Sequence, residues 1–145
     1  MQRALFIVLC ALGIVSARNQ NGAKLRKVSI SRDGGATWSP LRDDAALIES
    51  QCQASLLRHP GGGDPARAVF LFSNPATKVG RTNGTIRLSR DEGKTWPVAR
   101  VLYAGGFAYS CLSSLPDGAV GCLFERDGYK TISFARFPVN WVDSP

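Results

Sequence analysis

The stretch Lys27-Val-Ser-Ile-Ser-Arg-Asp-Gly-Gly-Ala-Thr-Trp38 recurs 58 residues later as Thr85-Ile-Arg-Leu-Ser-Arg-Asp-Glu-Gly-Lys-Thr-Trp96. The two copies share Ser, Arg, Asp, Gly, Thr and Trp at the same offsets. A third stretch, from Thr131 to Trp141, keeps the apolar alternation and the Trp but lacks the Asp-x-Gly turn. A repeat of this length indicates a fold built from similar supersecondary units.

Each copy predicts a strand, a tight turn and an aromatic side chain that folds back. Apolar side chains alternate in the two strands, at Val28 and Ile30 and again at Ile86 and Leu88. The Asp accepts hydrogen bonds from backbone N–H groups of the turn, the Gly supplies backbone freedom, and the Trp packs between neighbouring strands. These roles fall on Asp33, Gly35 and Trp38 in the first copy and on Asp91, Gly93 and Trp96 in the second.

The remaining chain also predicts short strands rather than helices. Alternating or apolar runs occupy Gln53–Arg58, Ala68–Ser73, Ala99–Tyr103, Ala108–Leu115 and Ala119–Glu125. Turn signals separate them at 61–65, 74–75, 105–106 and 116–118. Many short strands on a long repeat predict an all-β fold and, more narrowly, part of a β-propeller. At about 50 residues a blade the chain covers roughly two to three blades, whereas closure takes about four or more.

Composition excludes several classes of protein. The 145 residues are 44% hydrophobic and 20% charged, which suits one domain with a core. The net charge of +7 is scattered singly along the chain, so we expect no nucleic-acid partner. The four cysteines form no C-x-x-C motif, and His59 is the single histidine, expected at the surface. We therefore predict no metal site, no cofactor and no disulfide scaffold.

The amino terminus allows two interpretations. Met1-Gln-Arg3, the uncharged run from Ala4 to Val15, and Ser16-Ala17 together resemble a secretion signal cleaved after residue 17, which would place the protein outside the cytoplasm. The run is too short for a transmembrane span, which needs about 20 residues. The same region also fits a strand from Gly13 to Arg18 whose upstream sequence is absent. The sequence leaves both interpretations open.

The Ser-x-Asp-x-Gly-x-Thr-Trp elements at 31–38 and 89–96 resemble the Asp box, or BNR repeat, of sialidases and some other propellers. The surrounding sequence is more specific than the box. Its ordered segments are Cys52–Arg58, Phe72–Pro75, Arg81–Trp96, Ala108–Leu112, Leu115–Gly118 and Gly121–Glu125. This series, over roughly residues 13 to 142, resembles the carboxy-terminal half of an exo-α-sialidase. The resemblance implies that 18–145 is part of a six-bladed propeller from a retaining, metal-independent enzyme that acts on terminal sialic acids of glycoproteins and glycolipids.

The resemblance also implies roles for four residues. Arg18 and Arg81 look like the second and third arginines that grip the substrate carboxylate. Tyr109 looks like the nucleophile, and Glu125 looks like the glutamate that holds the first arginine in place. Three parts of the family's site have no counterpart here: the first arginine, the Asp acid/base and the Glu that activates the tyrosine. We therefore expect the missing blades, or contacts in an oligomer, to be needed.

The residue types suit this chemistry. A planar guanidinium meets a carboxylate in a bidentate fork and stays charged at any working pH. The carboxylate of a sialic acid would repel an anionic nucleophile, so a neutral phenol is the reasonable attacker, as in the sialidase exception among glycosidases. A phenol with a pKa of about 10 needs a neighbouring base to take its proton.

Hairpin register gives an independent expectation. If Pro116-Asp117-Gly118 forms a three-residue loop, paired residue numbers add up to 234. Tyr109 then lies opposite Glu125 on one face of the sheet. The same register puts Cys111 and Cys122 on opposite faces, so we expect no disulfide between them.

Two other functions compete with a sialidase. A non-catalytic Asp-box module would use the same propeller for sialic-acid binding or for structural assembly. A weaker alternative is an anion-binding surface protein that depends on the +7 charge. Sequence upstream of residue 1 would separate the first two possibilities.

Overall fold

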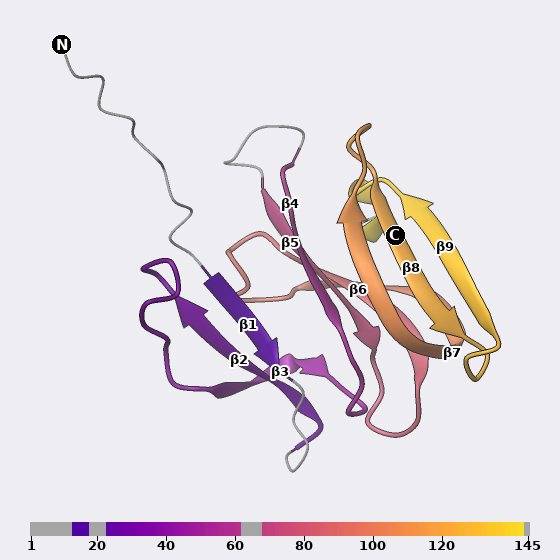
Figure 1. Cartoon of the computed structure of the whole chain (residues 1–145), viewed down its shortest axis with the longest axis horizontal. Helices are drawn as coiled ribbons and strands as arrows, with labels where there is room; N and C mark the ends of the chain where they lie inside the picture. The colour runs from indigo at the N-terminus through magenta and orange to yellow at the C-terminus, as the bar shows by residue number, and fades with distance from the viewer. Residues whose placement is uncertain (1–12, 18–22, 62–67, 144–145) are drawn as a thin grey trace.

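A computed structural model describes residues 13–17, 23–61 and 68–143. The predictions for residues 1–12, which include Cys10, and for Arg18 lie outside the described residues. Nine strands and one short helix make up the described part, which confirms the all-β prediction. Figure 1 shows how the strands are arranged. The elements are β1 Gly13–Ala17, β2 Leu25–Ser31, β3 Arg42–Ile48, β4 Ser55–His59, β5 Val69–Pro75, β6 Thr82–Ser89, β7 Val98–Ser114, β8 Val120–Arg126, β9 Thr131–Phe137 and α1 Asn140–Asp143.

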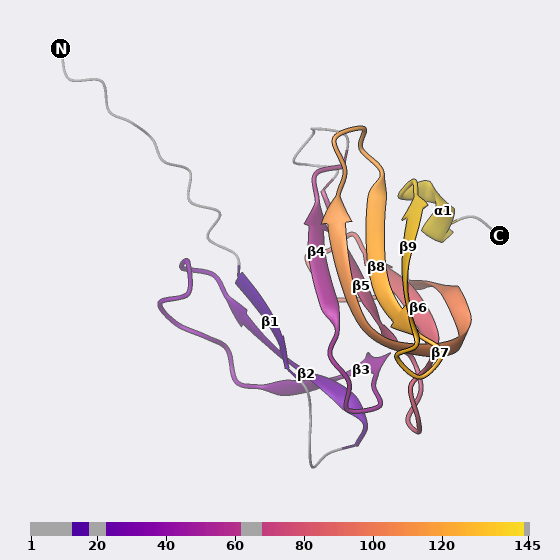
Figure 2. The same cartoon turned by 45° about the vertical axis from the view of Figure 1, so that its right-hand side comes forward.

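The strands form two antiparallel sheets in chain order. The first sheet is β1-β2-β3 and the second is β4-β5-β6-β7-β8-β9. Figure 2 shows the second sheet curling, so that β7 bends from β6 round to β8. The curl brings the carboxy-terminal half of β7 against β4 and β5, where the hydroxyls of Ser73 and Ser110 lie 2.6 Å apart. β4 and β5, which are far from β7 in the sequence, thus contact its carboxy-terminal half.

β7 corrects the prediction of a turn at Gly105-Gly106. The strand runs through both glycines for 17 residues. It pairs with β6 as far as Gly106 and with β8 from Phe107. A Cβ at Gly106 would lie 3.2 Å from the backbone N of Asp127, and that N–H donates to the Gly106 carbonyl at 3.1 Å. The glycine therefore marks a close backbone approach inside a bent strand, not a turn.

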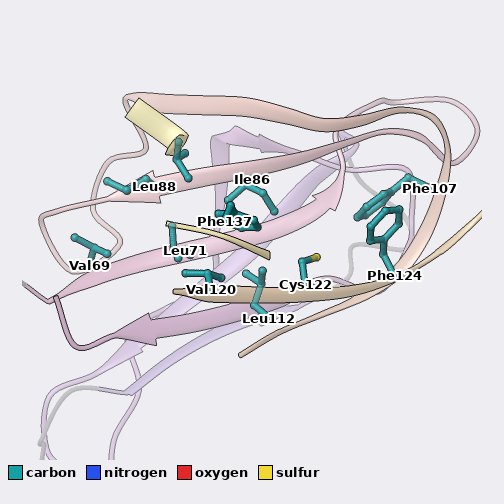
Figure 3. Packing of buried hydrophobic residues seen from close by; sticks show 11 residues of the cluster. Val69, Leu71, Ile86, Leu88, Phe107, Leu112, Val120, Cys122, Phe124 and Phe137 are labelled. Atoms are coloured by element: carbon teal, nitrogen blue, oxygen red, sulfur yellow. The ribbon is translucent and has the colours of Figure 1, made fainter. Parts of the chain in front are cut away.

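One apolar cluster fills the curled sheet. Figure 3 shows Leu71, Ile86 and Leu88 from the adjacent strands β5 and β6 in this cluster. At its other end Phe107 stacks on Phe124 with 4.9 Å between ring centres. A Cβ at Gly84 would lie 2.0 Å from the Phe107 ring, so only glycine fits there. This packing fixes the point along β7 at which the strand stops pairing with β6 and begins to pair with β8.

The Asp-box turns carry the hydrogen bonds that the repeat predicted. The carboxylate of Asp33 accepts the N–H of Thr37 at 2.9 Å, and Asp91 accepts the N–H of Thr95 at the same distance. Both Asp side chains also accept a threonine hydroxyl at 2.6 Å. The hydrogen-bond prediction is confirmed for both copies.

The tryptophans of the two Asp boxes differ in burial. Trp96 is 8% exposed and packs against Phe72, with 5.9 Å between ring centres, as predicted. Trp38 is 45% exposed, so its predicted packing between strands is wrong. It lies beside Gly13 at the β1 side of the first sheet, and its indole N–H donates to the Gly35 carbonyl at 3.1 Å. Trp96 lies in a core cluster that draws on both sheets, whereas Trp38 lies at the outer side of one.

Other differences are local. His59 is buried rather than at the surface, with its Nε2 at 3.1 Å from the Gly118 carbonyl. The third repeat stretch ends in α1, where Trp141 packs on Phe137 with 4.9 Å between ring centres. This helix was not predicted, because four residues are too few to show a helical period. Among the described residues, no helix has the length and apolar character needed to cross a membrane.

Candidate active site

The β7–β8 hairpin has the predicted register next to its loop. The N–H of Leu115 donates to the Ala119 carbonyl at 2.8 Å, and the pairs from Ser114↔Val120 to Ser110↔Phe124 all add up to 234. Cys111 is accordingly exposed while Cys122 is buried, and both are free thiols, as expected.

The register shifts between Phe107 and Ser110, so Tyr109 lies in an irregular part of β7. Its backbone N–H donates instead to the Glu125 carboxylate at 3.3 Å. Tyr109 and Glu125 are therefore neighbours as predicted, but through a side chain-to-backbone contact rather than as a regular cross-strand pair. Such bulges re-aim side chains beside functional sites, and the Tyr109 side chain is left 42% exposed.

Gln53 holds the bulge from the other side. Its Oε1 accepts the N–H of Ser110 at 2.9 Å, and its Nε2 donates to the Ala54 carbonyl at 2.8 Å. Two residues on, the Ser55 hydroxyl accepts the N–H of Leu112 at 2.9 Å. Gln53, just before β4, and Ser55, its first residue, thus supply acceptors to backbone groups of β7. Sequence reasoning missed Gln53, since one polar residue before a strand gives no distinctive signal.

Arg81 comes from the connection before β6 and reaches the same place. Its carbonyl accepts the N–H of Phe107 at 2.8 Å, which fixes its backbone beside the bulge. Its guanidinium Cζ lies 5.5 Å from the centre of the Tyr109 ring. The guanidinium also donates from Nη1 to the hydroxyl of Tyr129, whose ring centre lies 5.9 Å from Cζ. Tyr129 was not singled out from the sequence, because it belongs to none of the repeat motifs and to none of the segments that carry the resemblance.

A depression of about 400 Å³ lies beside Tyr109. Its lining residues are Gln53, Tyr109, Ser110, Cys111, Leu123, Phe124, Glu125 and Ile132. It presents a phenol and a carboxylate on an otherwise largely apolar surface. The guanidinium of Arg81 over the Tyr109 ring adds a fixed positive charge. An anion bound to Arg81 would therefore lie next to the Tyr109 side chain.

Of the four predicted site residues, three are brought together: Arg81, Tyr109 and Glu125. Arg18 lies outside the described residues, directly after β1 in the chain. Within the described ranges 13–17, 23–61 and 68–143, no three His, Cys, Asp or Glu side chains gather as a metal site would require.

A buried ion pair behind the site was also missed. Arg26 on β2 contacts Glu49 with 2.7 Å between Nη1 and Oε2, and the residues are only 4% and 0% exposed. The sequence did contain a signal for this pair. Arg26 lies two residues before Val28 and therefore on the same buried face of the strand, so its charge had to lie in the core. Arg26 also donates to the Cys52 carbonyl at 2.9 Å, next to Gln53.

Comparison with known proteins gives consistent matches. The model of the BNR repeat-like domain matches residues 12–122. A sialidase of Micromonospora viridifaciens is 38% identical over 133 residues, covering 89% of this chain and 20% of that protein. A sialidase of Bacteroides fragilis is 37% identical over 117 residues, covering 77% of this chain and 21% of that protein.

Solved structures agree with the sequence matches. The Hadza microbial sialidase Hz136 superposes with a TM-score of 0.75 at 31% identity, covering 91% of this chain and 26% of that chain. The NanB sialidase of Streptococcus pneumoniae superposes with a TM-score of 0.78 at 19% identity over 91% of this chain and 22% of that chain, which shows a shared fold.

The two sheets are thus part of a β-propeller, as the repeat predicted. The chain belongs to the BNR repeat-like domain family, and it is similar to sialidases over most of its length. It spans about a fifth of the length of the two curated relatives described.

Proposed function

We propose that this chain forms part of the catalytic propeller of a retaining exo-α-sialidase that removes terminal sialic acids from glycoconjugates. The observation that carries the proposal is the 5.5 Å separation between the Arg81 guanidinium and the Tyr109 ring. A carboxylate binder and a nucleophile must lie side by side in this reaction, because the sialic-acid carboxylate is attached to the carbon under attack. The similarity to sialidases of two bacteria supports the same reaction.

The residues divide the work by their chemistry. Arg81, together with Arg18, would hold the substrate carboxylate in guanidinium forks. Tyr109 would attack the anomeric carbon through its phenol oxygen as the glycosidic bond breaks, and water would then hydrolyse the tyrosyl-sugar bond with net retention. Glu125 would hold the first arginine of the triad while it accepts the Tyr109 N–H. The acid/base and the base for Tyr109 would come from the remainder of the protein.

The substrates would be sialylated glycoproteins and glycolipids. A location outside the cytoplasm rests on the predicted secretion signal alone. A second candidate is a non-catalytic module that binds sialic acid. It would use the same Arg81 guanidinium beside the Tyr109 ring to hold the carboxylate, without a chemical step.

The test uses the longest natural protein that contains this chain and a fluorogenic sialoside. Tyr109→Phe should abolish turnover and leave the melting temperature unchanged, because only the phenol oxygen is lost. Tyr103→Phe removes a phenol from the same strand, and this control should keep kcat. Hydrolysis by Tyr109→Phe at the wild-type rate would remove Tyr109 from the nucleophile role. A wild-type protein that binds sialic acid without turnover would favour the binding module.

A further inference from the structure

We propose that Tyr129 is a positioning residue that orients Arg81 toward the substrate carboxylate, an inference that rests on the sialidase function proposed above. Tyr129 lies in the turn between β8 and β9, 48 positions along the chain from Arg81. Its hydroxyl accepts a hydrogen bond from Arg81 Nη1. Tyr129 as a whole is 57% exposed.

Arg81 lies close to two aromatic rings. The guanidinium Cζ is 5.5 Å from the centre of the Tyr109 ring and 5.9 Å from that of Tyr129. Both distances fall within the range in which a cation is attracted to a ring face. The hydrogen bond to Tyr129 adds a direction to this attraction. Arg81 is therefore held by Tyr109, to which we assign a step of the reaction, and by Tyr129, to which we assign none.

The turn that carries Tyr129 has an unusual backbone. Asp127, Gly128 and Tyr129 all have positive φ, at 55°, 67° and 68°. This conformation is unfavourable for residues with a side chain, and for a bulky tyrosine it is rare. Strain of this kind persists only where surrounding contacts enforce it, and it gathers at functional sites.

Asp127 supplies the contacts that enforce the turn. Its N–H donates to the Gly106 carbonyl at 3.1 Å, and its carboxylate accepts the Tyr103 hydroxyl at 2.9 Å. Arg126 donates to the same carboxylate at 2.7 Å. The turn is thus fastened to β7 just before the bulge that carries Tyr109. Tyr109 and Tyr129 both follow Arg81 in the chain, and both rings lie close to its guanidinium in the fold.

Tyr129 would favour binding because it restricts the Arg81 side chain before the ligand arrives. A long arginine side chain loses rotamer entropy when it becomes fixed on a ligand, and prior fixing removes part of that cost. A phenol has one O–H donor besides its acceptor lone pairs. Because the Tyr129 oxygen accepts from Arg81, its hydrogen can be donated to an anion at the guanidinium. Tyr129 would therefore strengthen substrate binding and leave the chemical step unchanged.

The experiment measures kcat and KM on a fluorogenic sialoside, and Kd for free sialic acid by titration calorimetry, in the longest natural protein. Tyr129→Phe, which keeps the ring, should raise KM and Kd about three- to tenfold, as expected for one lost hydrogen bond, with kcat within about twofold of wild type. Tyr129→Ala should raise both further because the ring contact is lost as well. Tyr109→Phe gives the opposite pattern, with kcat lost and Kd retained.

The outcomes separate the two proposals. A wild-type protein that neither binds sialic acid nor hydrolyses the sialoside refutes the proposed function. If wild type is active, a KM and Kd for Tyr129→Phe within about twofold of wild type overturn the role of Tyr129, whatever Tyr129→Ala shows. A fall in kcat with unchanged KM and Kd overturns it too, since positioning of a binding group acts on affinity.

Discussion

Arg26 and Glu49 form an ion pair, with 2.7 Å between Nη1 and Oε2, that joins the first sheet to the segment leading into β4. The same guanidinium donates to the carbonyls of Ser16 and Cys52, each at 2.9 Å. The pair therefore links β1, β2 and the residues immediately before Gln53. Through Gln53 it also supports the bulge that carries Tyr109.

We expect Glu49→Leu to lower the free energy of unfolding by about 3–5 kcal/mol, because it leaves the buried Arg26 cation without its counter-ion. Arg26→Met together with Glu49→Leu should lose less than the single change, since no charge is then left unpaired. Urea unfolding followed by fluorescence measures both changes.

The chain offers a matched control in the Lys27–Asp43 pair. It has a similar separation of 2.8 Å, but each side chain is about one-third exposed. Asp43→Asn should cost less than about 1 kcal/mol. Equal losses of unfolding free energy for Glu49→Leu and Asp43→Asn would show that burial does not make the Arg26–Glu49 pair more important for stability than an exposed pair.

Gln53→Leu should lower kcat with little change in the melting temperature. Leucine keeps the volume but removes the acceptor for the Ser110 N–H, so the bulge and Tyr109 can shift, and a displacement of about 1 Å can cost up to about 100-fold in rate. The comparison is Ser55→Ala, which removes the acceptor for the Leu112 N–H further from Tyr109. Equal kcat losses in the two variants would contradict a specific role for Gln53.

The sequence predicted those parts of the fold that depend on local pattern. The Asp-box hydrogen bonds and the hairpin register up to Ser110 follow from turn chemistry and from period-two alternation. The bent course of β7 through Gly105 and Gly106 could not be predicted, because paired glycines are equally typical of turns. The contact of Arg81 with Tyr129 was also out of reach, since it depends on how tightly the sheet curls.

Stability should fall at low pH through the two Asp boxes. Hydrogen bonds from Thr37 lower the pKa of Asp33 to about 2. At Asp91 burial raises the pKa, but the bonds from Thr95 and Ser89 outweigh it and lower the pKa to about 2. A carboxyl whose pKa is depressed in the folded state stabilises above its unfolded pKa of about 4, and this stability is lost as pH falls toward 2. The unfolding midpoint in urea should therefore drop between about pH 4 and pH 2.

Asp91→Asn provides the control for this pH dependence. It should destabilise the protein at pH 6 and flatten the fall between about pH 4 and pH 2, because one of the two carboxyls no longer titrates. A variant that keeps the full wild-type slope would mean that the acid sensitivity arises elsewhere.

Arg81→Lys should weaken binding of free sialic acid about tenfold or more, because an ammonium cannot form the bidentate fork with a carboxylate. The same change at Arg136, an exposed residue paired with Asp117 at the far end of the hairpin, should leave the Kd unchanged. Titration calorimetry measures both. An unchanged Kd for Arg81→Lys would remove Arg81 from the carboxylate site.

Residues 1–145 expressed alone should self-associate and show no sialidase activity. On the face of the β7–β8–β9 strands that borders the depression beside Tyr109, Cys111, Leu123 and Phe134 lie in one cross-strand row, with Ile132 beside them, and all four are exposed. Exposed apolar rows of this kind drive association, and β9 adds an edge open to further strand pairing.

Activity should be absent because the predicted site lacks its acid/base, and sialic-acid binding should be weak because the first arginine is missing. Light scattering gives the mass, and a fluorogenic sialoside gives the activity. Leu123→Thr with Phe134→Thr should shift the mass toward the monomer, whereas Val79→Thr, an exposed change in the connection between β5 and β6, should not. A soluble monomer that hydrolyses the substrate would show that the acid/base role is filled by a residue within these 145.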